Sequence, residues 1–534
     1  MAKWDSTAFT TIEHLSNMNP FDPDNRTDRA PDPSNNSWVS EDIWGHRIER
    51  QPCFLLLLEF LSMAEAMHRT GRLLNNAMTS SEVTYRPYLS TQLRNILFKN
   101  PLISEILIDR GNTEQAWDEW FASMSDSVAK HEDLKDYSYL KTRFDDFETF
   151  ESVVKLLSRI SIKELDARQW NHMRIYPIGP AAYYDERDRS FNSGRTQFTR
   201  TGEIAYLMLA RSTHHKSEIK AALEKAFDTD GSKNQLLCTL MRDKKPDLSD
   251  SDKSGTYLPY KVHPSYDLLA EDVHALFHLN MPAPDAFLHL APLLAFHVML
   301  YQLQTAAAVL EIPAPAIICE ILAPRSTQVR KASIECINNN EILAVESVTR
   351  FFNKREALDE KITRILTEDD PKEQSTVDDY RTALKSLFSI KDDPAGITIE
   401  EVRQSTLKAI HKNYKDSAGD GLRSMADEAG LRSRIKSRQH RYCPSDQFLR
   451  SMVLVNVTRS IKETDFLTIL HKRYGIVIGA VQANGTVDPV LFQKNEFENN
   501  ANRLVSRLVA MGLARRMSDS FTYIINPITK DHAS

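Results

Sequence analysis

The chain has 534 residues, and at about 100–200 residues per domain this length predicts about three domains. Hydrophobic residues make up 41% of the chain and there are only 16 glycines, a balance that favours a mainly α-helical protein and argues against a sandwich or barrel. The five cysteines are scattered, which excludes a disulfide framework and a zinc knuckle and favours a reducing compartment.

The N-terminal sequence is polar, so no signal peptide is expected. An apolar run at 53–58 is too short to cross a membrane. The apolar segment 286–310 contains His289, Pro292 and His297, which favours a buried helix over a lipid-facing one. We therefore expect a cytoplasmic protein without membrane contact.

Residues 1–39 are expected to form an extended N-terminal arm. The stretch 17–37 holds four prolines and four aspartates with little apolar content, a composition that does not support a packed element. The arm is either a disordered leader or a segment that orders on a partner protein, with Trp38 and Trp44 as its anchors.

A first helical domain is predicted over 40–245. Its strongest element is an apolar helix at 53–67, which begins after Gln51 and Pro52. Further helices are predicted at 88–98, 101–110, 113–130, 145–159 and 203–211. The helix at 113–130 carries an aromatic stripe that we interpret as core and not as a base-stacking surface, formed by Trp117, Trp120 and Phe121.

The stretch 172–202 interrupts this domain as a long loop or a small β excursion, because Pro177, Gly179 and Pro180 break regular structure. A loop of this length in a compact domain is often functional. A solvated loop that pairs its own charges is the first interpretation, and a phosphate or partner site is the second. The residues that could line such a site are Tyr183, Tyr184, Arg187, Arg189, Arg195 and Arg200.

A second helical domain is predicted over 256–429, after a polar and turn-rich linker at 243–255. The apolar segment 286–310 is expected to be its central helix. Other helices are predicted at 268–279, 314–322, 326–337, 340–366, 377–388 and 398–412, with an acidic linker at 368–376.

Positive charge is concentrated near the C-terminus, although the whole chain has a net charge of −6. Residues 430–442, predicted to be a basic linker, contain five Lys/Arg and no acidic residue, and residues 443–534 add eleven Lys/Arg against eight Asp/Glu. This asymmetry predicts that only the C-terminal end faces a polyanion. The cations of the linker are Arg432, Arg434, Lys436, Arg438 and Arg441.

Residues 443–534 are predicted to form the last domain. Helices are predicted at 444–457, 462–474 and 497–511, with a short strand at 475–479. Gly512 follows the third helix in the place of a C-cap glycine. Two short strands then follow at 513–517 and 521–525, joined by a tight turn at 518–520. This order resembles the end of the winged-helix class of DNA-binding domains, which belongs to the helix-turn-helix group.

The resemblance implies that the N-terminal half of the helix 497–511 enters the major groove of DNA. Asparagine can bond adenine and arginine can bond guanine at their base edges. On this helix the candidate DNA-binding residues are Asn499, Asn500, Asn502, Arg503, Ser506 and Arg507, and at the wing they are Arg515 and Arg516. We expect Arg503 and Arg507 to be exposed.

A winged helix used only for protein docking is the alternative. Glu496 and Glu498 would repel DNA at the start of the helix. The basic segment 430–442 favours DNA over this alternative.

The sequence contains no P-loop, no dinucleotide-binding glycine loop, no H-E-x-x-H motif and no nucleophile elbow. Two histidines four residues apart share one helix face and could ligate a metal, but a hydrogen-bonded core histidine is the commoner explanation. We therefore expect no cofactor, no metal and no catalytic residue. The metal alternative uses Glu271, Asp272, His274, His278, His289 and His297.

A second enzymatic alternative is a nuclease. Glu218 and Lys220 match the E-x-K half of a nuclease motif, with Asp185 and Asp188 upstream. The surrounding charges are typical of an exposed amphipathic helix with spaced ion pairs, which is the first interpretation.

Two stretches, WGHRIERQPCFLLLLEFL and FTRTGEIAYLMLARS, resemble uncharacterised accessory subunits of bacterial DNA-defence operons. The resemblance implies a place in a multiprotein DNA-processing or anti-phage defence complex. We therefore interpret the chain as a non-enzymatic scaffold or accessory subunit that contacts double-stranded DNA through its winged helix, beside separate motor or nuclease subunits. A metal-dependent, nuclease-like enzyme that uses the second helical domain is the alternative.

Overall fold

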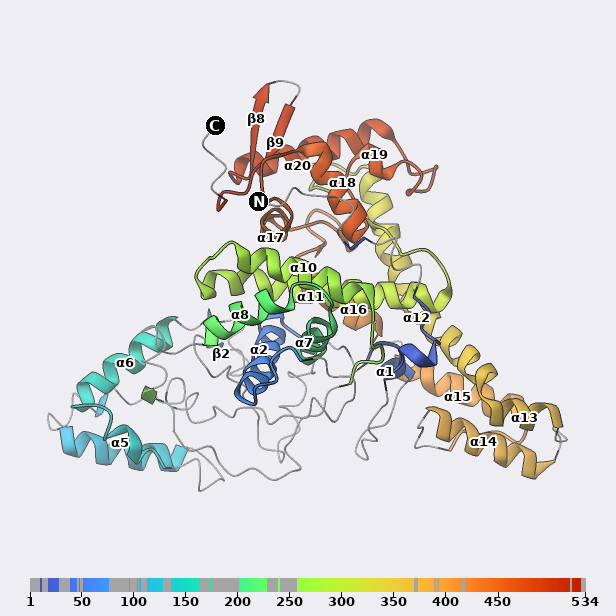
Figure 1. The fold of residues 1–534 in the computed structure, drawn as a ribbon, viewed down its shortest axis with the longest axis horizontal. Helices are drawn as coiled ribbons and strands as arrows, with labels where there is room; N and C mark the ends of the chain where they lie inside the picture. Colours follow the sequence, from blue (N-terminus) through green and yellow to red (C-terminus); the bar gives the residue numbers. More distant parts are fainter. Residues whose placement is uncertain are drawn as a thin grey trace.

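A computed structural model describes most of the chain, and Figure 1 shows its arrangement. The described residues are 10–11, 18–27, 39–45, 48, 51–75, 96, 103, 105–106, 113–127, 136–160, 162–163, 173–174, 201–227, 239–240, 257–368, 373–388, 390, 393–414, 418–518 and 521–529. The mainly α-helical fold class is confirmed, because the described strands are few and short.

Helices α10 (Pro264–His278) and α11 (Ala283–Leu310) form the centre of the molecule, and α2 (Cys53–Arg69) and α7 (Thr201–Arg211) pack on one side of them (Figure 1). Every residue of α7 is buried. The crossing of α2 and α7 needs a glycine, because a Cβ atom at Gly202 would lie 2.1 Å from the carbonyl oxygen of Leu56. The predicted helices 53–67 and 203–211 are thus confirmed as central elements.

By length and composition, the segment Asp285–Leu310 of α11 could cross a membrane. Within the protein, 89% of its apolar window is buried by other parts of the chain. The prediction that this segment is a buried core helix is therefore confirmed, and its apolar surface contributes to the core instead of facing solvent.

Helix α12 (Gln328–Leu358) continues through the break predicted between the helices 326–337 and 340–366, and the second predicted helix is instead interrupted at Asp359, after which α13 begins. The polar run at its centre does not end it, because Asn340 is buried and donates to the hydroxyl of Tyr442 at 3.1 Å. Shorter helices surround its C-terminal part (Figure 1). They are α1 (Val39–Trp44), α13 (Glu360–Glu368), α14 (Gln374–Phe388), α15 (Ile399–Tyr414) and α16 (Ala418–Glu428).

Helices α5 (Thr113–Ser127) and α6 (Phe147–Ile160) form a separate small cluster with the 3-10 helix Ser138–Leu140. The aromatic stripe of α5 is its core, with Trp117 and Trp120 buried against Phe150 at ring-centroid distances of 4.9 Å. The core interpretation of this stripe is confirmed.

The described parts of the N-terminal arm pack on the chain's own helices. The Thr10 amide donates to the Glu271 carboxylate at 3.0 Å, and the Phe21 ring stacks on Phe351 at 5.3 Å. The indole of Trp44 donates to the carbonyl oxygen of Gln302 at 3.0 Å. Trp44 therefore anchors its segment to the body of this chain, while Trp38 lies outside the described residues.

The C-terminal module, residues 443–529, lies on the side of α10 and α11 opposite α2 and α7 (Figure 1). Its helices are α17 (Asp446–Asn456), α18 (Glu463–Tyr474), α19 (Ala480–Ala483) and α20 (Lys494–Ala510). Its strands are β6 (Ile461–Lys462), β7 (Ile476–Val477), β8 (Ala514–Ser518) and β9 (Phe521–Ile524). Strands β6, β9 and β8, in that order, form an antiparallel sheet.

The module is joined to the body by a parallel pair between β3 (Ile317–Ile318) and β7. The predicted helix 314–322 is wrong, because this segment is extended and its amides donate to Gly475 and to Val477 of the module. Buried residues of α2, α11, α14, α17 and α20 belong to one continuous hydrophobic cluster, and the predicted division into domains stays a prediction.

Several predictions fall on residues outside the described parts of the chain. They include most of the helices 88–98 and 101–110, most of the loop 172–202 and the whole linker 243–255. A two-stranded pair, β1 (Ile162–Lys163) with β2 (Met173–Arg174), borders that loop.

Candidate nucleic-acid interface

The segment predicted as a basic linker forms a β-hairpin. Strand β4 (Arg432–Ser433) pairs antiparallel with β5 (Arg441–Tyr442), and residues 434–440 form its tip. The hairpin precedes α17 directly, so it belongs structurally to the junction between the body and the C-terminal module.

A buried carboxylate, Glu320, anchors the base of this hairpin. It accepts from the Arg330 guanidinium at 2.9 and 3.0 Å, from the Arg441 guanidinium, and from the Ala323 amide at 3.2 Å. Glu320 and Arg441 are fully buried and Arg330 nearly so. Buried charges are tolerated when they are paired and hydrogen-bonded, as here. We call Glu320, Arg330 and Arg441 the clamp.

The two guanidinium groups of the clamp also hold the tip of the hairpin. Arg441 donates to the carbonyl oxygen of Ile435 at 2.9 Å, and Arg330 donates to that of Lys436 at 3.1 Å. Lys436 has a φ of +56°, a left-handed conformation that a residue with a side chain adopts at a cost. The clamp therefore fixes the tip in one geometry.

The five cations of the hairpin fall into two groups, three that are exposed and two that are paired within the chain. Arg434, Lys436 and Arg438 are exposed on the tip and form no ion pair with any described residue. The prediction that Arg441 contacts DNA is wrong, because its guanidinium is fully buried on Glu320. Arg432 pairs with Asp427 at 2.8 Å and is largely buried, so its charge is already neutralised.

The electrostatic environment of the tip is positive. Burial lowers the pKa of the His440 imidazole, and the neighbouring Arg432 and Arg434 lower it further, while Asp427 opposes them. A cationic field that disfavours a protonated histidine also favours a bound anion.

Helix α20 turns one face towards the body. Glu496, Asn500 and Arg507 lie on this face, spaced so that they share one side of a helix. The Asn500 side chain donates to the carbonyl oxygens of Cys319 and Ile478 at 2.9 and 3.0 Å and accepts from the Ile321 amide at 2.8 Å. The prediction that Asn500 reads DNA is wrong, because it is fully buried and its hydrogen bonds hold α20 on the body.

The other two residues of this face also make contacts within the chain. The Glu496 carboxylate accepts from the Gln328 amide at the N-terminus of α12, so this charge is directed away from solvent. Arg507 is partly buried, pairs with Asp446 and donates to the carbonyl oxygen of Pro444 at 2.9 Å. The expectation of a fully exposed Arg507 is wrong. Glu498 remains exposed beside Lys494, at 3.6 Å.

Arg503 lies on the same face of α20, between Asn500 and Arg507. It is partly buried, and its Nε and Nη2 atoms have no hydrogen-bond partner among the described residues. Its expected full exposure is therefore wrong. Buried N–H groups without an acceptor are costly, so these two nitrogens would gain from a nearby anion.

A third face of α20, between the face on the body and the buried apolar face, is exposed and polar. Asn499, Asn502 and Ser506 lie on it, and Arg516 of β8 donates to the Ser506 hydroxyl at 3.3 Å. Arg515 is also exposed on the same strand. The structure thus brings β8 next to the exposed face of α20, while residues 519–520 of the predicted turn lie outside the described parts.

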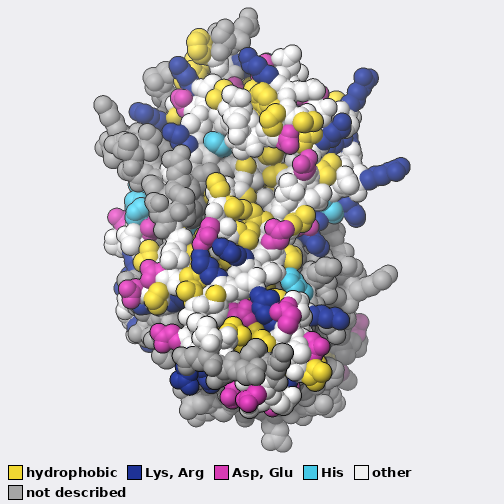
Figure 2. Space-filling view, turned by 90° about the vertical axis from the view of Figure 1, so that its right-hand side faces the viewer, with side chains coloured by type: hydrophobic (Ala, Val, Ile, Leu, Met, Phe, Trp, Pro, Cys, Tyr) yellow, Lys and Arg dark blue, Asp and Glu magenta, His cyan; other side chains and the backbone are white. Residues whose placement is uncertain are grey.

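Figure 2 shows one side of the molecule, where Lys and Arg side chains are interspersed with Asp and Glu. This side carries no extended area of a single charge in its described part. On this side of the molecule the charges are mixed, so the candidate interface is argued from individual cations such as Arg434, Lys436 and Arg438 of the tip.

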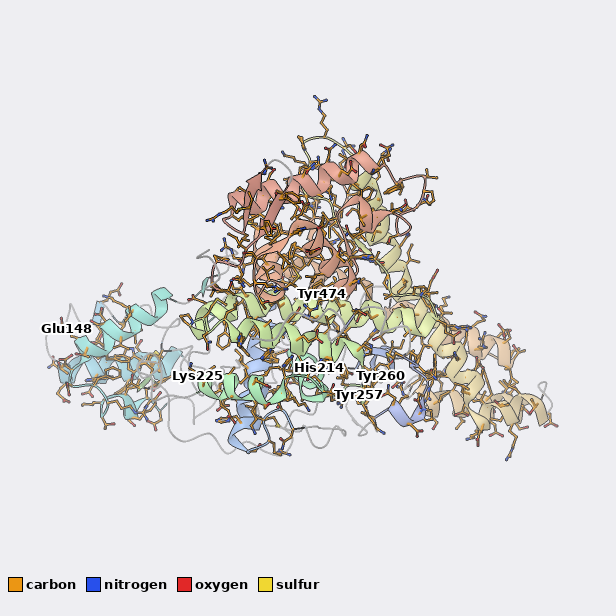
Figure 3. The ribbon with its side chains drawn as sticks, turned by 45° about the horizontal axis from the view of Figure 1, so that its top comes forward. Glu148, His214, Lys225, Tyr257, Tyr260 and Tyr474 are labelled. Atoms are coloured by element: carbon orange, nitrogen blue, oxygen red, sulfur yellow. The ribbon has the colours of Figure 1, made fainter. Side chains whose placement is uncertain are left out.

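The carboxylates of the metal alternative form a buried network instead. Asp272 accepts from the Tyr474 hydroxyl at 2.8 Å and pairs with Arg473 at 2.8 Å, and it contacts His297 at 2.9 Å. Glu271 pairs with the same Arg473 at 2.9 Å. Burial would raise the pKa of the Asp272 carboxyl, but Arg473 and His297 hold it below its usual value. Tyr474 lies where the module meets α10 and α11 (Figure 3).

The remaining histidines of that alternative do not converge. His274 stacks on His215 at a centroid distance of 3.9 Å, and His289 contacts the Ser451 hydroxyl at 2.9 Å. Among the described residues, no group of three or more His, Cys, Asp or Glu side chains is arranged to hold a metal ion.

Helix α8 (Lys216–Phe227) carries the E-x-K sequence. Glu218 is exposed and accepts from the Ser217 hydroxyl at 2.8 Å, and Lys220 lies 4.0 Å from Glu224, one turn along the helix. This agrees with the interpretation as an exposed amphipathic helix, while Asp185 and Asp188 lie outside the described residues.

Sequence reasoning did not identify Glu320, Arg330, Arg473 or Tyr474. Glu320 lies in the apolar run IICEIL, where a single carboxylate needs a buried cation. The isolated acid indicates a buried ion pair, but it does not identify the partners, Arg330 and Arg441, which are 10 and 121 residues away in the sequence. Periodicity within one helix cannot find such pairs.

Comparison with known proteins gives one match. A family model described as "Methylation-associated defense system protein MAD7" matches residues 318–527, less than half of the chain. The matched part begins at β3 and ends after β9, so it contains the clamp, the hairpin and the C-terminal module. Neither the curated proteins nor the solved structures contain a match to the chain. The similarity to a defence-system protein agrees with the resemblance to defence-operon subunits, although the stretches that suggested it lie outside residues 318–527.

Proposed function

We propose that the chain is a non-enzymatic, DNA-associated accessory subunit of a bacterial defence system. In this proposal it contacts double-stranded DNA through a C-terminal winged-helix domain and lies in the cytoplasm beside separate motor or nuclease subunits. The similarity to a methylation-associated defense system protein supports the defence role.

The order of elements in the C-terminal module supports the winged-helix assignment. Helix α17 is followed by strand β6, helices α18, α19 and α20, and then strands β8 and β9, with β9 between β6 and β8 in the sheet. Three long helices, α17, α18 and α20, against a three-stranded sheet whose last two strands form a hairpin are the arrangement expected of a winged helix, and α19 is a single short turn between α18 and α20.

The observation that carries the DNA proposal is the clamped hairpin. Three cations on a tip of fixed geometry can contact phosphates without first ordering the chain, so less conformational entropy is lost on binding. The partly buried guanidinium of Arg503 and the cations Arg515 and Arg516 of the β8–β9 hairpin would supply further phosphate contacts.

The proposal is tested by neutralising the tip in the full chain. The variant Arg434→Gln with Lys436→Gln and Arg438→Gln should weaken binding of a fluorescein-labelled 25-base-pair duplex at least about tenfold at about 0.1 M salt, measured by anisotropy. The tip residues are exposed, so the fold should be kept.

The matched control removes three exposed cations from the body, by Lys225→Gln with Lys361→Gln and Lys408→Gln. Lys225 lies on α8, away from the C-terminal module (Figure 3). An equal loss of binding in both variants would indicate non-specific attraction, and unchanged binding in the tip variant would refute the proposed contact.

A second candidate function is protein docking by the same module. It is favoured by Val481 and Val490, which are 81% and 84% exposed on and after α19. Exposed apolar residues of this kind are found at protein interfaces. Wild-type protein that binds no duplex, but loses a co-purifying subunit on Val481→Asp with Val490→Asp, would favour docking.

A further inference from the structure

The outer face of the three-stranded sheet carries aromatic and cationic side chains in a fixed row. Lys462 on β6 and Arg515 on β8 both pair with Tyr523 on β9, so the three side chains point to the same face. Phe521 lies two residues before Tyr523 on the same strand and therefore shares this face. The Lys462 ammonium lies 5.6 Å from the centre of the Phe521 ring, which agrees with this placement.

This face points away from the core. The neighbouring row of paired residues, Ile461, Ile524 and Ala514, faces inward, with Ile524 fully buried and Ala514 nearly so. On the outer face the Phe521 side chain is 53% exposed, and Lys462 and Arg515 are exposed. No Asp or Glu occurs in β6, β8 or β9, so the described strands contribute no negative charge to the face.

We propose that this face binds an unpaired nucleic-acid strand, whose bases stack on Phe521 and Tyr523 while its phosphates contact Lys462 and Arg515. Aromatic rings flanked by cations are the combination that binds single strands without sequence preference. The positive charge of the face fits the phosphate backbone and argues against a basic or an uncharged apolar partner, and the two rings favour stacked bases over an acidic protein. The inference rests on the proposed nucleic-acid role of the module but uses a different surface from the hairpin tip.

A subunit with both surfaces could hold a duplex and a strand displaced from it. Duplex DNA has its bases stacked and paired, so it offers the rings no free base face. The two surfaces therefore have different substrates. Replacing the two rings should leave duplex binding intact, and replacing the tip cations should leave single-strand binding intact, whereas Arg515 can contact phosphates of either substrate.

The test measures binding of fluorescein-labelled single strands, dT15 and U15, to the full chain by anisotropy. Replacing both rings, by Phe521→Leu with Tyr523→Leu, should weaken binding about tenfold or more, because each stacked base contributes appreciably. The hairpin-tip variant should keep single-strand binding, and the ring variant should keep duplex binding. A preference for dT15 or for U15 would assign the natural strand as DNA or RNA, and either outcome supports the site.

The matched control is Thr522→Val, which changes the same strand on its opposite face, where Thr522 pairs with Arg516. If the ring variant lowers the melting temperature, Lys462→Gln with Arg515→Gln tests the face without altering the rings and should also weaken binding. Single-strand binding that is absent, or unchanged within twofold in both face variants, would overturn the inference. Equal loss of duplex and single-strand binding in the ring variant would also overturn it.

Discussion

The imidazole of His263 is a buried titratable group that makes the stability of the fold depend on pH. Its Nδ1 atom accepts from the Ser265 amide at 3.1 Å and so caps the N-terminus of α10, and its Nε2 atom contacts the Thr305 hydroxyl at 3.3 Å. The Thr305 hydroxyl donates to the carbonyl oxygen of Tyr301, so Nε2 is the donor to Thr305 and Nδ1 carries no proton. Burial lowers the pKa of His263 to about 3.

This pKa predicts a loss of stability in mild acid. Between about pH 6.5 and pH 3 the unfolded chain binds a proton at His263 that the folded chain does not, so the free energy of unfolding falls by roughly 1.4 kcal/mol per pH unit. His263→Asn keeps a capping side chain without the titration and should reduce this dependence, measured by urea unfolding at pH 7 and pH 5. The exposed His278→Asn is the control, and equal pH dependence in His263→Asn and wild type would contradict the account.

Asn499 and Asn500 are adjacent on α20, but Asn500 has a structural role and Asn499 is free to contact a ligand. Asn500 is fully buried with three backbone partners, whereas Asn499 is exposed. Asn500→Ala should lower the free energy of unfolding by about 1–3 kcal/mol, because it leaves backbone groups unsatisfied. Asn499→Ala should change it by less than about 0.5 kcal/mol. Similar effects of the two substitutions in urea unfolding would argue against the docked position of α20.

At the scale of elements, the hairpin was the part of the candidate site that sequence reasoning described least well. The five cations of 430–442 form an obvious run in the sequence, but Arg441 is buried on Glu320, which lies 121 residues away, and no local pattern indicates this pairing. The extended segment 317–318 was missed for a related reason, because its strand partner is β7. Local patterns predicted α2, α7 and α11 well, since each shows a long apolar run that only burial can satisfy.

Helix α20 and the strands β8 and β9 were predicted more closely, because their signals are local. The apolar spacing of α20, Gly512 with a φ of +71°, and two short runs after it are all within one stretch. The face that each residue presents was not predictable in the same way. Asn499 and Asn500 look equivalent as base-reading residues, and only the packing of α20 on the body distinguishes them.

The clamp predicts that the hairpin loses its fixed geometry when Glu320 is neutralised. Glu320→Gln leaves two buried guanidinium groups without a counter-charge and should lower stability by about 3–5 kcal/mol in urea unfolding. Trypsin should then cleave faster at the three tip cations. Asp427→Asn, which removes only the partner of Arg432, should cost less than about 1 kcal/mol. Trypsin cleavage at equal rates in the two variants would argue against a clamped tip.

At the scale of the whole molecule, the buried network of Asp272, Arg473 and Tyr474 fixes the C-terminal module to α10 and α11. Glu271 extends this network to the N-terminal arm through Thr10. The module is therefore carried by an ordered body and not by a flexible linker. This arrangement suits a subunit that positions DNA relative to other proteins of a complex.

The central claim, that clamped cations contact the phosphates of duplex DNA, is tested most directly by the salt dependence of duplex affinity. Each phosphate contact contributes about −0.9 to the slope of log K against log salt concentration. We predict that neutralising Arg434, Lys436 and Arg438 makes the slope of the full chain less negative by about two to three, while the control on Lys225, Lys361 and Lys408 leaves it unchanged. A slope that is the same in wild type and the tip variant would contradict the account.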